Sequence, residues 1–202
     1  KIRAEMIDNL RRRGGPDAVL ITGRVKNDMA QQLIGKTLAE IADEWDVSDI
    51  DAAIRIVRGG GAGIASFNMN PEDIRNLMKQ PWVMTSSDGS TGHPRKFASY
   101  PRKYQVYVKD ERLLTMSEFV HKSSGMVADT FNLCNRGYLK EGYVADVTVI
   151  DPNNYQPKAD FQNPAQLSSG VETLFVNGVM VIDKGAYTGV RSGTAIDRGV
   201  CY

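Results

Sequence analysis

Short apolar strand patterns alternate with helix patterns through the first half of the sequence. The stretches 18–22, 64–67 and 82–87 are mostly apolar or β-branched, which is typical of strands buried on both faces of a sheet. Helix patterns separate them, and this alternation is typical of βα units around a parallel sheet. A closed barrel of such units needs eight strands. The pattern therefore predicts an α/β chain that forms the last part of a barrel.

The helix starts between these strands follow local capping rules. Thr37 and Glu40 have the spacing of a capping box, and so do Thr115 and Glu118. Ser48 is a further N-cap candidate. We expect the helix that begins after Thr115 to run without a break to residue 135.

Three further signals complete this half of the chain. A helix pattern covers residues 1–13, and Asn70-Pro71 is a typical helix start. The glycines 59–61 lack the Gly-Lys-Ser/Thr ending of a phosphate loop, so they are interpreted as the end of a helix.

The pattern changes after residue 135. Residues 145–149 alternate between apolar and polar side chains, and two further strand patterns flank Asn177-Gly178, a strong hairpin signal. The stretch 151–169 is expected to be a connecting loop. We therefore divide the chain into a barrel portion, 1–135, and an antiparallel β portion, 136–202.

Composition excludes several classes of function. The 202 residues carry a net charge of +1, with Lys and Arg scattered, which gives no electrostatic case for nucleic acid. No apolar run is long enough to cross a membrane. Cys134 and Cys201 form no metal motif. So few cysteines also argue against a disulfide framework and fit a reducing, cytoplasmic location. The first residue is Lys1 and a helix pattern follows at once, so the chain is expected to be part of a longer protein.

A candidate catalytic carboxylate follows the third strand pattern. There the apolar run ends in Ser86-Ser87-Asp88-Gly89, and a loop rich in Gly, His, Pro and Arg comes next. A strand end fixes a side chain while the following loop supplies shape and charge, which is a common arrangement in active sites. Asp-Gly is also an ordinary turn, so a turn-forming Asp88 is the competing interpretation. No nucleophile elbow surrounds the two serines, which are expected to pack and orient Asp88.

Five short stretches resemble a known family. The stretch 86–89, the sequence His93-Pro94-Arg95 and the Tyr-Pro-Arg turn at 100–102 resemble the segment around the catalytic aspartate of N-acyl-D-amino-acid deacylases, or D-aminoacylases. The stretch 142–152 (GYVADVTVIDP) resembles the signature at which amidohydrolase chains enter their β-sandwich. The stretch 174–178 (LFVNG) resembles the hairpin that follows it.

The resemblance implies a (β/α)8 barrel, with a β-sandwich built from both ends of the chain. This sequence would supply the C-terminal portion of that barrel and part of the sandwich, with 18–22, 64–67 and 82–87 as strands six to eight. The family's Cys and His metal ligands would lie upstream, in the N-terminal part of the same enzyme, which would hold most of the zinc site. The implied substrate is an N-acyl-D-amino acid, whose amide bond is hydrolysed.

The resemblance also implies roles for single residues. Asp88 would accept a proton from the metal-activated water and deliver it to the departing amine, and would contact the metal weakly or through water. Arg95 would bind the substrate carboxylate in a planar, bidentate manner, from a loop that folds back over the barrel mouth. His93 and Thr22 are candidates for lining the pocket, and a loop-shaping His93 and a plain strand end at Thr22 are the alternatives. His121, beside the polar Lys122, is interpreted as exposed.

Two other functions remain open at this point. The enzyme could act on another amidohydrolase substrate, such as a cyclic amide or a dipeptide. Alternatively, the isolated chain, without metal ligands of its own, could be a structural or interaction module.

Overall fold

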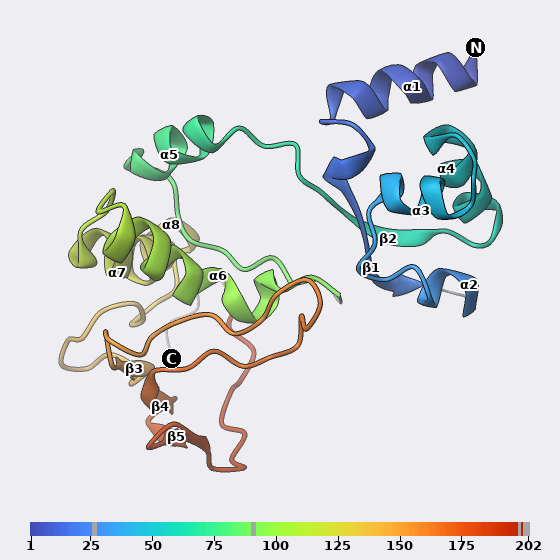
Figure 1. Ribbon diagram of the computed structural model, residues 1–202. Coiled ribbons are helices and arrows are strands. Elements are labelled where there is room, and N and C mark those ends of the chain that lie inside the picture. The colour runs from blue at the N-terminus through green and yellow to red at the C-terminus, as the bar shows by residue number, and fades with distance from the viewer. Residues whose placement is uncertain (26–27, 90–91, 198, 200–202) are drawn as a thin grey trace. The chain divides into compact units, whose positions relative to one another are not determined.

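A computed structural model describes residues 1–25, 28–89, 92–197 and 199 (Figure 1). The α/β chain folds into two compact units, each continuous in space but not in sequence. Unit 1 comprises Lys1–Ile74, Gly89–Lys96 and Asp160–Ala165. Unit 2 comprises Arg75–Asp88, Phe97–Ala159 and Gln166–Tyr202. The predicted division at residue 135 concerns the barrel and the sandwich, and stays a prediction.

Unit 1 is a pair of strands packed with helices. Its elements in order are α1 (Ile2–Arg12), a short 3-10 turn η1 (Pro16–Ala18), β1 (Val19–Val25), α2 (Asp28–Gln31), α3 (Leu38–Glu44), α4 (Asp49–Arg58) and β2 (Ala62–Ser66). Ile21 from β1, Ile41 from α3 and Ile56 from α4 are almost fully buried and form its core. α3 buries Leu38, Ile41 and Ala42. α4 buries Ile50, Ala52 and Ile56, whereas its Val57 is 70% exposed.

The two strands of unit 1 are antiparallel, not parallel as predicted. Ile21 lies opposite Ile64, and Thr22 lies opposite Gly63. The physical reason is the number of helices between the strands. A single crossover helix brings the chain back parallel to its first strand. Here α3 and α4, which pack on each other, add a second reversal of chain direction. The prediction that these two strands lie in a parallel sheet is therefore wrong.

The predicted helix starts are confirmed. Thr37 and Thr115 each accept a hydrogen bond from the backbone N–H three residues later, and both capping boxes are complete. Ser48 caps α4 in the same way, and Gly59 ends that helix. These signals are local in sequence, which is why they are readable without the fold.

The helices that follow differ in detail from the prediction. α5 covers Pro71–Lys79, as expected. The expected Tyr-Pro-Arg turn is instead part of α6 (Arg95–Lys103), and a π-helix, η2 (Tyr104–Asp110), continues it. The single helix expected after Thr115 is two, α7 (Met116–Ser123) and α8 (Gly125–Phe131), because Ser124 leaves the helical region with φ −139° and ψ −83°.

The break between α7 and α8 brings a glycine against an aromatic ring. A Cβ at Gly125 would lie 2.7 Å from the ring of Tyr138. Real Cβ atoms do not approach other heavy atoms so closely. Only a residue without a side chain fits at this position while Tyr138 keeps its place.

The predicted third strand, residues 82–87, begins in a turn at Trp82 and continues as an irregular segment without strand pairing among the described residues. Thr85 is buried, but Trp82 is 67% exposed. The backbone N–H of Thr85 donates to the carbonyl of Lys122, at 2.9 Å, as a single bond to α7. A strand requires a continuous ladder with a neighbour, which an apolar composition alone does not provide.

The predicted hairpin near the end of the chain is confirmed. β3 (Val147–Ile150), β4 (Val171–Val176), β5 (Val179–Asp183) and β6 (Ala186–Tyr187) form an antiparallel sheet in chain order. Asn177 and Gly178 both have positive φ, 50° and 77°, as a type I′ turn requires. The long loop 151–169 also lies where it was expected.

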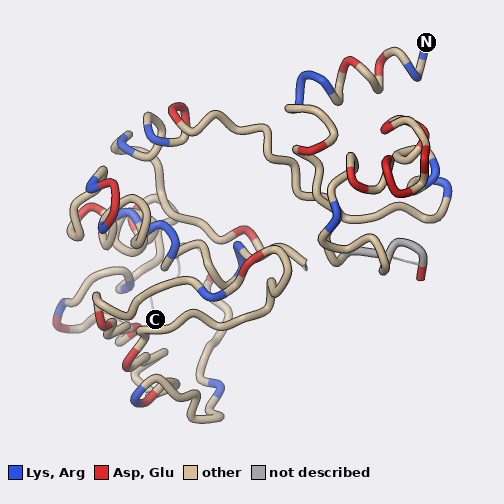
Figure 2. The backbone as a smooth tube through the Cα atoms, viewed as in Figure 1, with Lys and Arg blue, Asp and Glu red and all other residues tan. Residues whose placement is uncertain are grey.

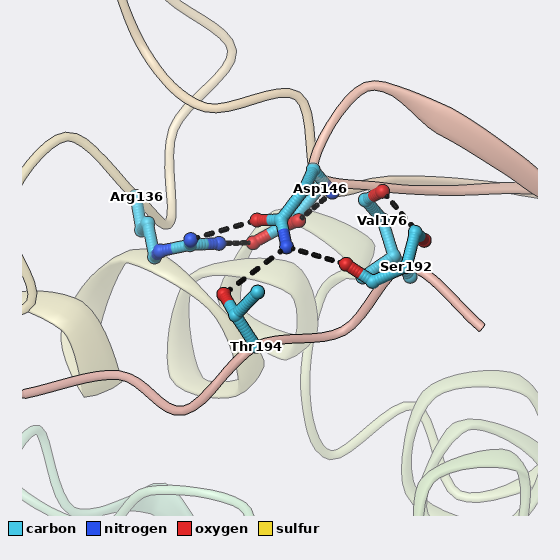
Figure 3. Close-up of polar contacts among 6 residues, drawn as sticks. Arg136, Asp146, Val176, Ser192 and Thr194 are labelled. Atoms are coloured by element: carbon cyan, nitrogen blue, oxygen red, sulfur yellow. Dashed lines mark hydrogen bonds and ion pairs between the residues drawn. The ribbon is translucent and has the colours of Figure 1, made fainter. Parts of the chain in front are cut away.

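A polar cluster fixes the turn of this hairpin (Figure 3). Arg136 forms an ion pair with Asp146 and donates to Asn177 Oδ1 at 2.8 Å. The Nδ2 group of Asn177 donates to the carbonyl of Ser192 at 2.7 Å, and Ser192 Oγ donates to the carbonyl of Val176 at 2.9 Å. The start of β3, the hairpin turn and the strand-free segment after β6 are thus connected.

Charge, helix hydropathy and the cysteines are the remaining features of the fold. Basic and acidic residues are interspersed along the backbone (Figure 2). No helix among the described residues is long and apolar enough to cross a membrane. Cys134 is disulfide-bonded, which corrects the expectation of reduced cysteines. Cys201 lies outside the described residues.

Candidate active site

Asp88 lies at the end of the irregular segment that follows the turn at Trp82, belongs to unit 2 and is exposed. Its backbone is in the left-handed region, with φ 42°. Few residues other than glycine adopt this conformation, and Asp is among those that tolerate it. The carboxylate is thus presented to solvent from a sharply turned backbone, which suits both a turn and a reactive group.

The residue that anchors this segment is Thr85, three positions before Asp88. Its Oγ1 lies 2.8 Å from Ser123 Oγ, and its carbonyl accepts a hydrogen bond from Tyr100 at 3.5 Å. Burial raises the pKa of that tyrosine, which keeps the donor protonated well above neutral pH. Ser86, in contrast, is exposed, so the anchoring role expected of the serines belongs mainly to Thr85.

Arg95 is the first residue of α6 and not part of a free loop, which corrects the sequence prediction. Its backbone N–H donates to His93 Nδ1 at 3.1 Å. That bond uses the Nδ1 lone pair and favours the tautomer with its proton on Nε2. The edge of the His93 ring packs on Phe161, with ring centroids 4.9 Å apart. The imidazole thus shapes the start of the helix that carries Arg95.

Thr22 is 5% exposed and lies in β1 of unit 1. Its neighbour Gly23 is in close backbone contact with Gly92, since a Cβ on Gly92 would lie 2.5 Å from Gly23 N. This contact places Thr22 near the stretch that contains His93. Unit 1 therefore brings together three of the four candidate residues, Thr22, His93 and Arg95. The fourth, Asp88, belongs to unit 2.

Sequence reasoning missed two buried lysines next to Thr85. Lys103 is 6% exposed and Lys122 is 5% exposed. Lys122 follows the buried Phe119 by three residues on α7, so the two lie on the same face of the helix. This spacing was the signal in the sequence that Lys122 is buried. His121, between them in sequence, is exposed as predicted.

The described residues contain no group of three or more His, Cys, Asp or Glu side chains that could hold a metal ion. A catalytic zinc typically has three protein ligands and an open position for water. Asp88 can supply one oxygen donor to such a site.

Comparison with known proteins shows which proteins this chain is similar to. No family model matches it. It is 31% identical to a D-aminoacylase of Alcaligenes xylosoxydans xylosoxydans over 90% of its own length, and 32% identical to an N-acyl-D-aspartate deacylase of the same organism over 82%. The chain is a homologue of the N-acyl-D-amino-acid deacylases. It spans 38% and 33% of the lengths of these two relatives.

Solved structures agree with this relationship. The chain matches a D-aminoacylase structure described with a binuclear metal centre at a TM-score of 0.79, with 30% identity, over 94% of this chain and 40% of that one. It matches an N-acyl-D-glutamate deacylase of Bordetella bronchiseptica, complexed with zinc and a phosphonate inhibitor, at a TM-score of 0.74, with 30% identity, over 85% of this chain and 36% of that one.

A dihydroorotase of Lactobacillus gasseri is 30% identical over 60% of this chain and 27% of its own length.

Proposed function

We propose that this chain is part of a metal-dependent hydrolase that cleaves the amide bond of N-acyl-D-amino acids. In the whole enzyme it contributes to a (β/α)8 barrel, and the sheet β3–β6 forms part of a β-sandwich. The observation that carries this proposal is the exposed carboxylate of Asp88 at the end of a segment anchored by Thr85. The similarity to a deacylase extends over 90% of the chain, and it supports a role in amide hydrolysis for that carboxylate.

Asp88 serves as the general base and then as the general acid. Its carboxylate accepts a proton from the water that attacks the amide carbonyl carbon, and afterwards delivers that proton to the departing nitrogen. The carbon–nitrogen bond then breaks, which leaves a carboxylate and an amine. A metal ion held mainly by the rest of the enzyme supplies the activation of the water and polarises the carbonyl.

Arg95 binds the α-carboxylate of the substrate. A guanidinium offers two parallel N–H donors that match the two oxygens of a carboxylate. The position of Arg95 at the start of α6, fixed by the bond to His93, limits the conformations of its backbone. Thr22 and His93 line the pocket from β1 and from the stretch before α6.

The test uses the whole enzyme that contains this chain, loaded with zinc. Turnover of N-acetyl-D-amino acids, with little turnover of the L enantiomers, is the expected result. Removal of the metal by a chelator should abolish turnover, and zinc should restore it. Absence of turnover on a panel of acyl groups and D side chains, with the metal bound, would contradict the proposal.

A cyclic-amide hydrolase is the second candidate, and the similarity to a dihydroorotase favours it. The same Asp88 chemistry opens a cyclic amide, because the proton again passes from water to the leaving nitrogen. Turnover of dihydroorotate or hydantoins with none of N-acyl-D-amino acids would select this second function.

A further inference from the structure

We propose that Lys103 and Lys122 are positioning residues for Asp88, because their side chains hold residues 80–88, an irregular segment without strand pairing among the described residues, in one position. This inference rests on the proposed role of Asp88. Neither lysine is expected to touch the substrate.

Lys122 of α7 holds the segment at three points. Its ammonium group donates to the carbonyl of Gln80 and, at 3.2 Å, to the carbonyl of Val83. Its own carbonyl accepts the backbone N–H of Thr85 at 2.9 Å. Lys122 therefore satisfies backbone hydrogen-bonding groups of Gln80, Val83 and Thr85. The segment that contains them has no strand pairing among the described residues.

Lys103 of α6 acts on the same segment from another element. Its ammonium group donates to Thr85 Oγ1 at 2.7 Å. The hydroxyl also bonds Ser123, so Thr85 is held through its N–H, its carbonyl and its side chain. Only two residues separate this fixed point from Asp88, so a fixed Thr85 restricts where the backbone of Asp88 can lie.

The burial of both ammonium groups is costly, which argues that they have a use. A buried charge is tolerated only when it is hydrogen-bonded, and apolar residues of similar size are often at least as stable in such places. The two cations also repel each other. The pKa of Lys103 is lowered to about 8, mainly by burial and further by Lys122. Precise placement of the segment is the benefit that we infer.

The size of the expected effect follows from the demands of proton transfer. A displacement of about 1 Å at a reacting group can reduce turnover roughly a hundredfold. We therefore expect Lys103→Met and Lys122→Met, made in the whole zinc-loaded enzyme, to lower kcat about tenfold or more, with KM and zinc content close to wild type. Lys79→Met, which removes an exposed lysine of α5, is the matched control and should have no effect.

Thr85 offers a second, milder set of variants in case a lysine variant does not fold. Thr85→Val keeps the shape but removes the acceptor of Lys103, so it should lower kcat as Lys103→Met does. Thr85→Ser keeps the hydroxyl and should retain most of kcat. The double variant of Thr85→Val and Lys103→Met should lose little more than either single one, because both remove the same hydrogen bond.

Amide hydrogen exchange separates this inference from the proposed function. Faster exchange at residues 83–88 in Lys103→Met and Thr85→Val, with α5 unchanged, supports the positioning role whatever Asp88 does in catalysis. If Asp88→Asn remains active, the proposed function fails while that readout stands. Folded, zinc-loaded variants with wild-type kcat and wild-type exchange would overturn the inference.

Discussion

The carboxylate of Asp146 accepts a hydrogen bond from the backbone N–H of Asn177 at 2.8 Å, and so joins the start of β3 to the turn between β4 and β5 (Figure 3). The same carboxylate pairs with Arg136, whose side chain is only 14% exposed. A single side chain therefore bonds the turn of the hairpin and compensates a largely buried charge.

Asp146→Ala should destabilise unit 2 by about 2–4 kcal/mol, because it leaves both the Arg136 guanidinium and the Asn177 N–H without this partner. The midpoint of urea unfolding measures the loss. Asp183→Ala, an exposed aspartate at the end of β5, is the control and should shift the midpoint little. Equal shifts in the two variants would show that the cluster has no special role.

Asp88→Asn should remove most turnover of the whole enzyme while folding and zinc content stay nearly unchanged. Proton transfer by a positioned group is typically worth about a hundredfold or more, and an amide cannot accept the proton. Steady-state kinetics of the purified variant measure the effect, and Asp110→Asn on η2 serves as the control. Near wild-type kcat would exclude Asp88 as the base.

Arg95→Lys should raise KM for N-acyl-D-amino acids sharply, because it keeps the charge but loses the two parallel donors. Matched substrates in which an amide replaces the α-carboxylate should be affected little. The comparison of the two substrate series is the measurement. Equal losses on both would indicate that Arg95 only supports the fold of α6.

Stability should rise with pH as Lys103 loses its proton. Its pKa is about 8 in the folded protein and 10.5 in the reference state, so between these values the unfolded chain binds the extra proton. The free energy of unfolding should therefore gain up to about 1.4 kcal/mol per pH unit from this group. Tyr100 and Lys122 are the titratable neighbours, and the pKa of Tyr100 is itself raised.

Urea unfolding of wild type and Lys103→Met at pH 7.5, 8.5 and 9.5 measures this contribution as the difference between the two slopes. Parallel slopes would mean that Lys103 titrates normally in the folded protein.

Gly92→Ala should destabilise unit 1 more than Gly35→Ala. Both glycines have positive φ, 79° and 86°, so the conformational strain is similar. A methyl group at Gly35 meets nothing within 4 Å, whereas one at Gly92 would collide with the backbone of Gly23. The excess, about 1–3 kcal/mol by analogy with overpacked cores, isolates the steric contact. Indistinguishable unfolding midpoints would show that the stretch at 92 and 93 does not rest on β1.

The sequence predicted the elements whose signals are local. The capping boxes at Thr37 and Thr115 and the Asn177-Gly178 turn involve residues a few positions apart, so their chemistry is visible in one dimension. The candidate Asp88 was found partly from its residues and partly from a family resemblance. Its protonation role remains a prediction.

The errors arose where partners are distant in the sequence. The apolar stretch 82–87 was expected to pair as a strand, but Thr85 instead bonds Lys122 and Lys103. The two lysines were missed because a charge is normally assigned to the surface. Strand direction in unit 1 depended on α3 and α4 acting together, which strand composition does not reveal.

The contact between Gly125 and the ring of Tyr138 has a consequence for sequence drift. Because a side chain at 125 and the aromatic ring at 138 would occupy the same space, position 125 can gain a side chain only if the ring at 138 moves or is replaced by a smaller group. We expect the two positions to co-vary among relatives: an alanine or serine at the first should be accompanied by a smaller residue at the second.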